Sequence, residues 1–344
     1  MSTFESIRDK CTLWYRQSKN KYETCGMVAS DLVITLLKQK KIPYQNVTHR
    51  LKDETSFLDK CCNGKYTDPI SEITDVCGVR IIGYTTTDVD AISKIIEKEF
   101  NIDWANSINK SSQLNSDQVG YLSVHYVASF SARRLKLAEY AQFQNIKFEV
   151  QIRTILQHAW AEVEHDRSYK FSGELPSEIK RRFYLVAGAL ELMDREFSRL
   201  SSEIDAYAKQ VNDATRKGNL EVAIDSTSLS EYLSIKLGDA ISIKNSFNGF
   251  DKEIVVELQK FGVNSLNKLD KMITNDVLDY AHKAKTKPRN YLGLLRDIMI
   301  INDPEKYLDS VWQHDWFFTN SSELDRLEKL NPNVGKIRDF FLYD

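Results

Sequence analysis

Basic and hydroxyl side chains are concentrated in one short stretch of the chain. Three cations and a hydroxyl fall within eleven residues: Arg50, Lys52, Ser56 and Lys60. Residues 47–52 alternate with the period of two that is typical of a strand, which puts Arg50 and Lys52 on one face. A helix capped by Thr55 or Ser56 would carry Ser56 and Lys60, four residues apart, on one side. The stretch could neutralise a polyphosphate.

Two carboxylates lie on separate predicted strands. Asp75 directly precedes the apolar run VCGVRIIGY, and Arg80 follows five residues later within that run. Glu149 shares one face of IKFEVQIR with Gln151 and Arg153. Asp75 and Arg80 have opposite parity, so one of them lies beyond the regular strand or Gly78 forms a bulge.

Two carboxylates surrounded by cations suit a magnesium-dependent phosphoryl transfer. The carboxylate oxygens would hold Mg²⁺ while the cations balance the phosphate charge. The alternative is that these are solvated charges on strand faces with ordinary ion pairs. No P-loop or Rossmann glycine pattern strengthens either interpretation.

The remaining sequence predicts the elements that position these residues. Helical spacing indicates helices over 3–22 and 27–40, separated at Gly26, and a strand over 121–130 has Tyr121 and His125 on one face. Apolar residues then recur every three or four positions in a long helix, 177–216, which either packs on its own domain or forms a dimer seam. We expect a first domain over 1–217, a linker over 218–228, and a mainly helical domain over 229–344 that includes the aromatic residues Trp312, Trp316, Phe317 and Phe318.

Composition limits the classes of protein and of partner. The 344 residues carry a net charge of −2, so a nucleic-acid partner would need a local basic patch. Five cysteines without a C-x-x-C pair argue against a zinc site or a disulfide framework, and the charged N-terminus lacks the apolar core of a signal peptide. We therefore expect a cytoplasmic protein without a membrane segment.

Four segments, in this order, resemble the synthetase domain of the RelA/SpoT family: RLKDETSFLDK from Arg50, DVCGVRI from Asp75, GYLSVHY from Gly120 and EVQIRTILQHAWAEVEHDRSYK from Glu149. The resemblance spans about residues 25–205. It implies an α/β (α+β) fold with a mixed, nucleotidyltransferase-like sheet flanked by helices. It also implies a transfer of the β,γ-pyrophosphate of ATP to a ribose 3′-hydroxyl, as in a GTP pyrophosphokinase that makes the alarmones ppGpp and pppGpp.

The same resemblance implies roles for individual residues. Arg50 and Arg80 would sandwich the adenine of ATP. The residues implied to contact its phosphates are Lys52, Ser56, Lys60 and Arg153. Asp75 and Glu149 would bind Mg²⁺, with Glu149 as the base for the acceptor hydroxyl. Tyr121 would stack on the acceptor base, with His125 and Gln151 nearby.

Departures from the family pattern leave the acceptor open. Asp117 and Val119 stand where many guanosine-accepting members have lysine and asparagine, and Leu122 stands where an arginine is often found. The acceptor is GDP or GTP or, as in toxic members, the tRNA 3′ end or an adenosine nucleotide. His165 and Asp166 are interpreted as helix residues of the synthetase rather than as a hydrolase site. A homo-oligomer and a regulatory protein partner of residues 229–344 are further hypotheses.

Overall fold

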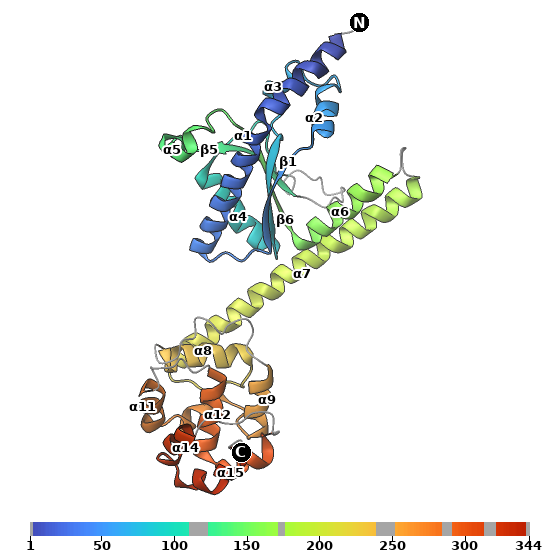
Figure 1. Ribbon diagram of the computed structural model, residues 1–344. Coiled ribbons are helices and arrows are strands. Elements are labelled where there is room, and N and C mark those ends of the chain that lie inside the picture. The colour runs from blue at the N-terminus through green and yellow to red at the C-terminus, as the bar shows by residue number, and fades with distance from the viewer. Residues whose placement is uncertain are drawn as a thin grey trace. The chain divides into compact units, whose positions relative to one another are not determined.

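The computed structural model describes residues 3–109, 123–170, 176–238, 252–283, 291–312 and 321–341 (Figure 1). It divides into two compact units, Met1–Ser201 and Ser202–Asp344. The division lies inside the long helix α7 (Ser177–Arg216), earlier than the expected boundary at residue 217. Within the described residues, no helix has the length and apolar character needed to cross a membrane.

A mixed sheet forms the centre of the first unit. Its strands are β1 (Asn46–Leu51), β2 (Cys77–Gly83), β3 (Phe100–Ile102), β4 (Ile108–Asn109), β5 (Val124–Phe130) and β6 (Phe148–Thr154). The strand order is β1-β2-β6-β5-β3, with β4 paired to β5, and only β2 and β6 run parallel to each other among these pairs of the described chain. The predicted mixed-sheet fold is therefore confirmed.

One continuous helix, α1 (Thr3–Lys40), replaces the two helices predicted over 3–22 and 27–40. Gly26 was interpreted as a break, and that interpretation is wrong. A Cβ at position 26 would lie 3.4 Å from the Cβ of His49 and 3.7 Å from that of Cys77. Both distances are ordinary van der Waals contacts, so α1 packs directly on the sheet at this position, on the face opposite to Arg50 and Arg80.

Shorter helices complete the first unit: α2 (Glu54–Cys61), α3 (Pro69–Glu72), α4 (Thr86–Glu99), α5 (Ala138–Ala141) and α6 (Ile155–Lys170). The N-cap of α2 is Asp53, whose carboxylate accepts a hydrogen bond from the backbone N–H of Ser56 at 2.9 Å. The predicted cap at Thr55 or Ser56 is thus wrong by two or three residues. Ser56 therefore lies in the first turn of α2.

Helix α7 packs on the first unit with small and polar side chains. Ala187 and Asp194 are buried, and the hydroxyl of Thr154, at the end of β6, donates to Oδ2 of Asp194 at 2.7 Å. Several residues of the predicted apolar seam are exposed instead, among them Val186, Met193 and Leu200. The expectation that this seam packs on its own domain is wrong for these residues.

The second unit is mainly helical, as predicted. Its helices are α8 (Ser226–Lys236), α9 (Lys252–Lys260), α10 (Leu266–Met272), α11 (Asn275–Lys283), α12 (Tyr291–Asn302), α13 (Pro304–Ser310), α14 (Ser321–Glu328) and α15 (Arg338–Phe341), with a 3₁₀ helix over Pro332–Ile337. Helix α12 is buried along most of its length and forms the centre of the core. Trp312 is buried in this core, whereas Trp316, Phe317 and Phe318 lie outside the described residues.

The segment predicted as a linker, 218–228, belongs to the second unit. Ile224 is buried, Ala223 forms a β-bridge with Ser265, and Asp225 caps α8 through a reciprocal capping box with Ser228. Polar composition suggested a linker, but these polar residues are occupied in capping a helix.

Candidate active site

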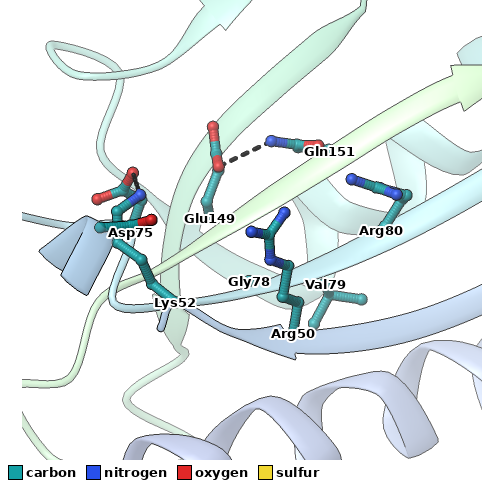
Figure 2. Close-up of a pocket in the computed structure, with 9 residues that line it drawn as sticks. Arg50, Lys52, Asp75, Gly78, Val79, Arg80, Glu149 and Gln151 are labelled. Carbon is teal, nitrogen blue, oxygen red and sulfur yellow. Dashed lines mark hydrogen bonds and ion pairs between the residues drawn. The ribbon is translucent and has the colours of Figure 1, made fainter. Parts of the chain in front are cut away.

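A cavity of about 270 Å³ lies on the face of the sheet opposite to α1 (Figure 2). Its lining consists of Arg50, Lys52, Ser56, Asp75, Gly78, Val79, Arg80, Glu149 and Gln151. Strand register explains why these distant residues meet: Arg50 pairs with Gly78, Gly78 with Glu149, and Arg80 with Gln151. Seven of the predicted site residues therefore line one cavity.

Asp75 lies two residues before β2 and is therefore outside the regular strand. This explains how Asp75 and Arg80 can lie at the same cavity although strand alternation would put them on opposite faces. Its Oδ2 accepts hydrogen bonds from Nζ of Lys52 at 3.0 Å and of Lys60 at 2.9 Å. Its Oδ1 is buried and has no hydrogen-bond partner. Burial favours a higher pKa for this carboxyl, but the bonds from the two lysines outweigh it and lower the pKa of Asp75.

Gly78 is a regular strand residue, because the register of β2 with β6 continues through it without a bulge. A Cβ at position 78 would lie 3.2 Å from the carbonyl oxygen of Glu149. The glycine thus keeps the floor of the cavity open where two strands lie close together.

Glu149 is held by two neighbours on the same face of the sheet. Nδ1 of His125 donates to its Oε1 at 2.7 Å, and Nε2 of Gln151 donates to its Oε2 at 2.9 Å. Nε2 of His125 in turn lies 2.5 Å from the hydroxyl of Ser123. Burial favours a higher pKa for Glu149, yet the hydrogen bond from His125 contributes most to lowering it, and the net pKa is lowered. The carboxylate is therefore ionised and fixed in orientation.

Arg80 has a partner that the sequence analysis did not include. Its guanidinium donates to Oε1 of Glu162, on α6, at 2.9 Å, and Nδ1 of His158 lies 3.6 Å from the same oxygen. Burial, followed by the positive charge of Arg80, lowers the pKa of His158. In the sequence, the spacing of four residues between His158 and Glu162 on a predicted helix indicates that these two side chains lie on one side of it.

Of the other predicted site residues, Lys60 and His125 contact the cavity carboxylates, and Arg153 is the one described residue that does not. Arg153 shares the face of β6 with Glu149 and Gln151 but lies beyond the cavity lining, where it pairs in register with Ile82. Tyr121 lies outside the described residues, as do Asp117, Val119 and Leu122. The side chains of His165 and Asp166 also lie outside the described part of α6.

Comparison with known proteins matches this region to one family. A family model described as "Region found in RelA / SpoT proteins" covers residues 49–174. Residues 49–174 therefore match the RelA/SpoT region. All nine residues that line the cavity lie within this range.

Individual relatives of the RelA/SpoT domain come from Bacillus subtilis. The chain is 28% identical over 171 residues to the GTP pyrophosphokinase YjbM, covering 47% of this chain and 74% of that protein. It is 24% identical over 168 residues to the GTP pyrophosphokinase YwaC, covering 47% of this chain and 76% of that protein. The solved structure of small alarmone synthetase 1 from the same organism aligns with 23% identity and a TM-score of 0.48, over 56% of this chain and 98% of that one.

The oxygen ligands of the RelA/SpoT domain fit a divalent cation in part. Among the described residues, no three His, Cys, Asp or Glu side chains gather as a metal site. Mg²⁺ characteristically needs only one or two carboxylates, because substrate phosphates and water complete its shell. The buried Oδ1 of Asp75, which has no hydrogen-bond partner, is the atom best placed for this, whereas Oε2 of Glu149 would first have to leave Gln151.

Proposed function

We propose that the chain is an ATP-dependent pyrophosphotransferase that moves the β,γ-pyrophosphate of ATP to the 3′-hydroxyl of GDP or GTP. The observation that carries this proposal is the cavity in which Asp75 and Glu149 lie beside Arg50, Lys52 and Arg80. The two relatives that are named GTP pyrophosphokinases support the guanine acceptor.

The charges of the cavity suit a phosphate-rich donor. Phosphoryl transfer needs mainly positioning and charge neutralisation, and Lys52 supplies a positive charge within the cavity. Lys60 reaches the same region through Asp75. In this proposal Arg50 and Arg80 flank the adenine, and Lys52, Ser56, Lys60 and Arg153 contact or neutralise the phosphates.

Glu149 takes the role of general base. In the transfer, the acceptor O3′ attacks the β-phosphorus of ATP, the bond from that phosphorus to the α,β-bridging oxygen breaks, and AMP leaves. The proton of the hydroxyl passes to Glu149, whose lowered pKa keeps it ionised and ready to accept. The bond from His125 holds the carboxylate in place.

A magnesium ion at Asp75 would withdraw charge from the transferred phosphates when bound. Lys52 and Lys60 donate to Oδ2 of Asp75, which leaves its Oδ1 available to bind the ion. Asp75 and Glu149 are thus the proposed metal ligands, with Asp75 as the principal one.

The acceptor site is proposed around His125, Gln151 and Tyr121. His125 and Gln151 flank Glu149, so an acceptor hydroxyl near this carboxylate would contact them. Tyr121 is included on the family resemblance and would stack on the base, an interaction worth about 1–3 kcal/mol.

The deciding experiment supplies the full chain with ATP labelled in its γ-phosphate, Mg²⁺ and one acceptor at a time. The acceptors are GDP, GTP, ATP and deacylated tRNA. We expect label on the guanine nucleotide in equal molar amount to released AMP, and no label with Glu149→Gln.

Each other result has a defined meaning. Label on tRNA or on an adenosine nucleotide would replace the acceptor half of the proposal with the toxin-like alternative. Release of inorganic phosphate or pyrophosphate without a labelled acceptor, or no AMP with any acceptor, would contradict the transferase itself.

A further inference from the structure

The first half of helix α1 makes a direct contact with a residue of the cavity. Tyr15 is buried, with 4% of its surface exposed, and its hydroxyl donates to the backbone carbonyl oxygen of Lys52 at 2.5 Å. Figure 2 shows the side chain of Lys52 beside Asp75, where its Nζ donates to Oδ2 at 3.0 Å. One hydrogen bond thus joins α1, at a position before the matched range 49–174, to a residue that lines the cavity.

The backbone of Lys52 depends on such contacts because this residue belongs to no helix or strand. Strand β1 ends at Leu51, and the N-cap of α2 is Asp53. The backbone N–H of Lys52 donates to the carbonyl oxygen of Val76 at 2.9 Å, and its carbonyl oxygen accepts from Tyr15. A hydrogen bond on each side therefore fixes the backbone of Lys52, and the backbone limits the directions that its side chain can take.

The ring of Tyr15 is held independently of its hydroxyl. It packs against Phe57 of α2 with 5.2 Å between the ring centroids, and the neighbouring Trp14 stacks on the same ring at 5.5 Å. Arg16 donates to Oε1 of Glu54, also on α2, at 3.0 Å. Three consecutive residues of α1 therefore hold α2, and removal of the hydroxyl alone leaves the ring packing in place.

The charges around Asp75 depend on where Lys52 lies. Lys52 and Lys60 both donate to Oδ2, whereas the buried Oδ1 has no hydrogen-bond partner. A Lys52 with a mobile backbone could leave Oδ2 or move to Oδ1. It would also lose conformational freedom each time a ligand fixed it, and a lysine that is already placed avoids this entropic cost of binding.

We propose that Tyr15 is a positioning residue of the cavity. Its hydroxyl holds the backbone of Lys52, so that the ammonium group is already in place when the donor phosphates bind. This inference rests on the proposed transfer from ATP and extends the site to a helix outside the matched range. Because Tyr15 acts through Lys52, its loss weakens donor binding and leaves use of the acceptor unchanged.

The test replaces Tyr15 by Phe in the full chain, which removes one oxygen atom and keeps the ring. We expect the affinity for a non-hydrolysable ATP analogue, measured by calorimetry, to fall by about three- to tenfold, the range that the loss of one hydrogen bond gives. The value of kcat/KM for ATP should fall by the same factor. The KM for the guanine acceptor should stay within about twofold of the wild type.

A double-mutant cycle separates positioning from a structural role. Lys52→Met removes the ammonium group but keeps the carbonyl oxygen that Tyr15 contacts. In this background, Tyr15→Phe should change the affinity for the analogue by less than about twofold, because the group that Tyr15 positions is already gone. A hydrogen bond that only fastens α1 to the end of β1 would give equal losses in both backgrounds.

Tyr22→Phe is the matched control, since it makes the same change on the same helix. The ring of Tyr22 packs edge-on against Trp14 with 5.6 Å between the centroids, and its hydroxyl has no hydrogen bond to the part of the chain that the structure describes. This variant should bind the analogue as the wild type does. Circular dichroism and thermal unfolding will show that each variant is folded at the temperature of the measurement.

Three results would overturn the role of Tyr15: an unchanged affinity in Tyr15→Phe, an equal loss in both backgrounds of the cycle, or a loss that falls on the KM for the acceptor. A wild-type chain that binds the analogue but transfers nothing would contradict the proposed function, while the binding cycle would still decide the role of Tyr15. A wild-type chain that does not bind the analogue would contradict both.

Discussion

Carboxylates with buried oxygens occur in both units of the chain, but their surroundings differ. In the first unit, Asp75 leaves one buried oxygen without a hydrogen bond beside a cavity. In the second unit, both oxygens of Glu257 accept from Nε of Arg296, at 3.2 and 2.9 Å, and Asp297 accepts from the hydroxyl of Tyr280 at 2.9 Å. Buried polar groups normally have hydrogen-bond partners, so the oxygen of Asp75 that lacks one indicates a ligand site. The fully hydrogen-bonded pairs of the second unit indicate a structural role.

This contrast predicts that substitutions in the first unit impair chemistry without unfolding the chain. Glu149→Gln should reduce the rate of transfer by at least about 10²–10⁴-fold, because it removes the proposed base while preserving size and hydrogen bonding. ATP binding, measured by calorimetry, should stay within a few-fold of the wild type. Retention of more than a tenth of the activity would contradict the role of Glu149.

Substitution within the ion pair of Glu257 and Arg296 should lower the stability of the second unit and leave the chemistry intact. Glu257→Ala leaves the mostly buried guanidinium of Arg296 without its principal partner, and breaking a buried pair costs about 3–5 kcal/mol. We expect a lower unfolding transition for the second unit in a denaturant series, and transfer rates within about threefold of the wild type under native conditions.

The matched control replaces both partners, as Glu257→Met/Arg296→Met, and should recover most of the lost stability. A large loss of transfer activity in a variant whose second unit remains folded would show that this unit takes part in the chemistry, and the contrast would fail.

Asp75→Asn should have a smaller effect that depends on magnesium. The amide cannot replace the carboxylate charge, and loss of groups that support a metal commonly costs about 10–100-fold in affinity. The Mg²⁺ concentration for half-maximal transfer should rise by at least tenfold. An unchanged magnesium titration would remove Asp75 from the proposed ligands.

The smallest expected effect is a shift in pH dependence. The pKa of Glu149 in the folded chain is lowered below the ordinary carboxyl value. The carboxylate therefore stays ionised as the pH falls through that value and is protonated only at lower pH. His125→Ala removes the hydrogen bond that lowers this pKa, and burial then raises it. The acid limb of the profile of kcat/KM against pH should move to higher pH.

A conservative variant separates positioning from mere packing. His125→Asn can place an amide N–H near the position of Nδ1 and should move the acid limb back toward that of the wild type. Identical profiles for His125→Ala and the wild type would show that His125 does not govern the ionisation of Glu149.

Local pattern predicted much of the sheet and the cavity. Alternation along β6 correctly put Glu149 and Gln151 on one face, and the mixed fold followed from the family resemblance. Parity alone left two explanations for Asp75 and Arg80, and the structure selected the one in which Asp75 precedes the strand. Pairing between distant strands decided this, and no single segment contains that information.

The errors arose where tertiary packing overrode local signals. Gly26 favours a helix break by propensity, yet α1 continues through it where the helix packs against His49 and Cys77. Apolar spacing identified α7 but did not show which side the domain would bury, because Thr154 anchors the polar side through Asp194. The ion pair of Arg80 with Glu162 joins a strand to a later helix, so the helical spacing of His158 and Glu162 could not by itself reveal it.

The parallel pairing of β2 with β6 also has a consequence for how the chain acquires its site. Arg50, Asp75 and Arg80 leave the ribosome well before Glu149, and parallel β pairing between distant segments is slow to form. A nascent chain that ends before β6 carries the cations of the cavity without the carboxylate proposed as the base. The full set of cavity side chains can therefore come together only once β6 lies between β2 and β5.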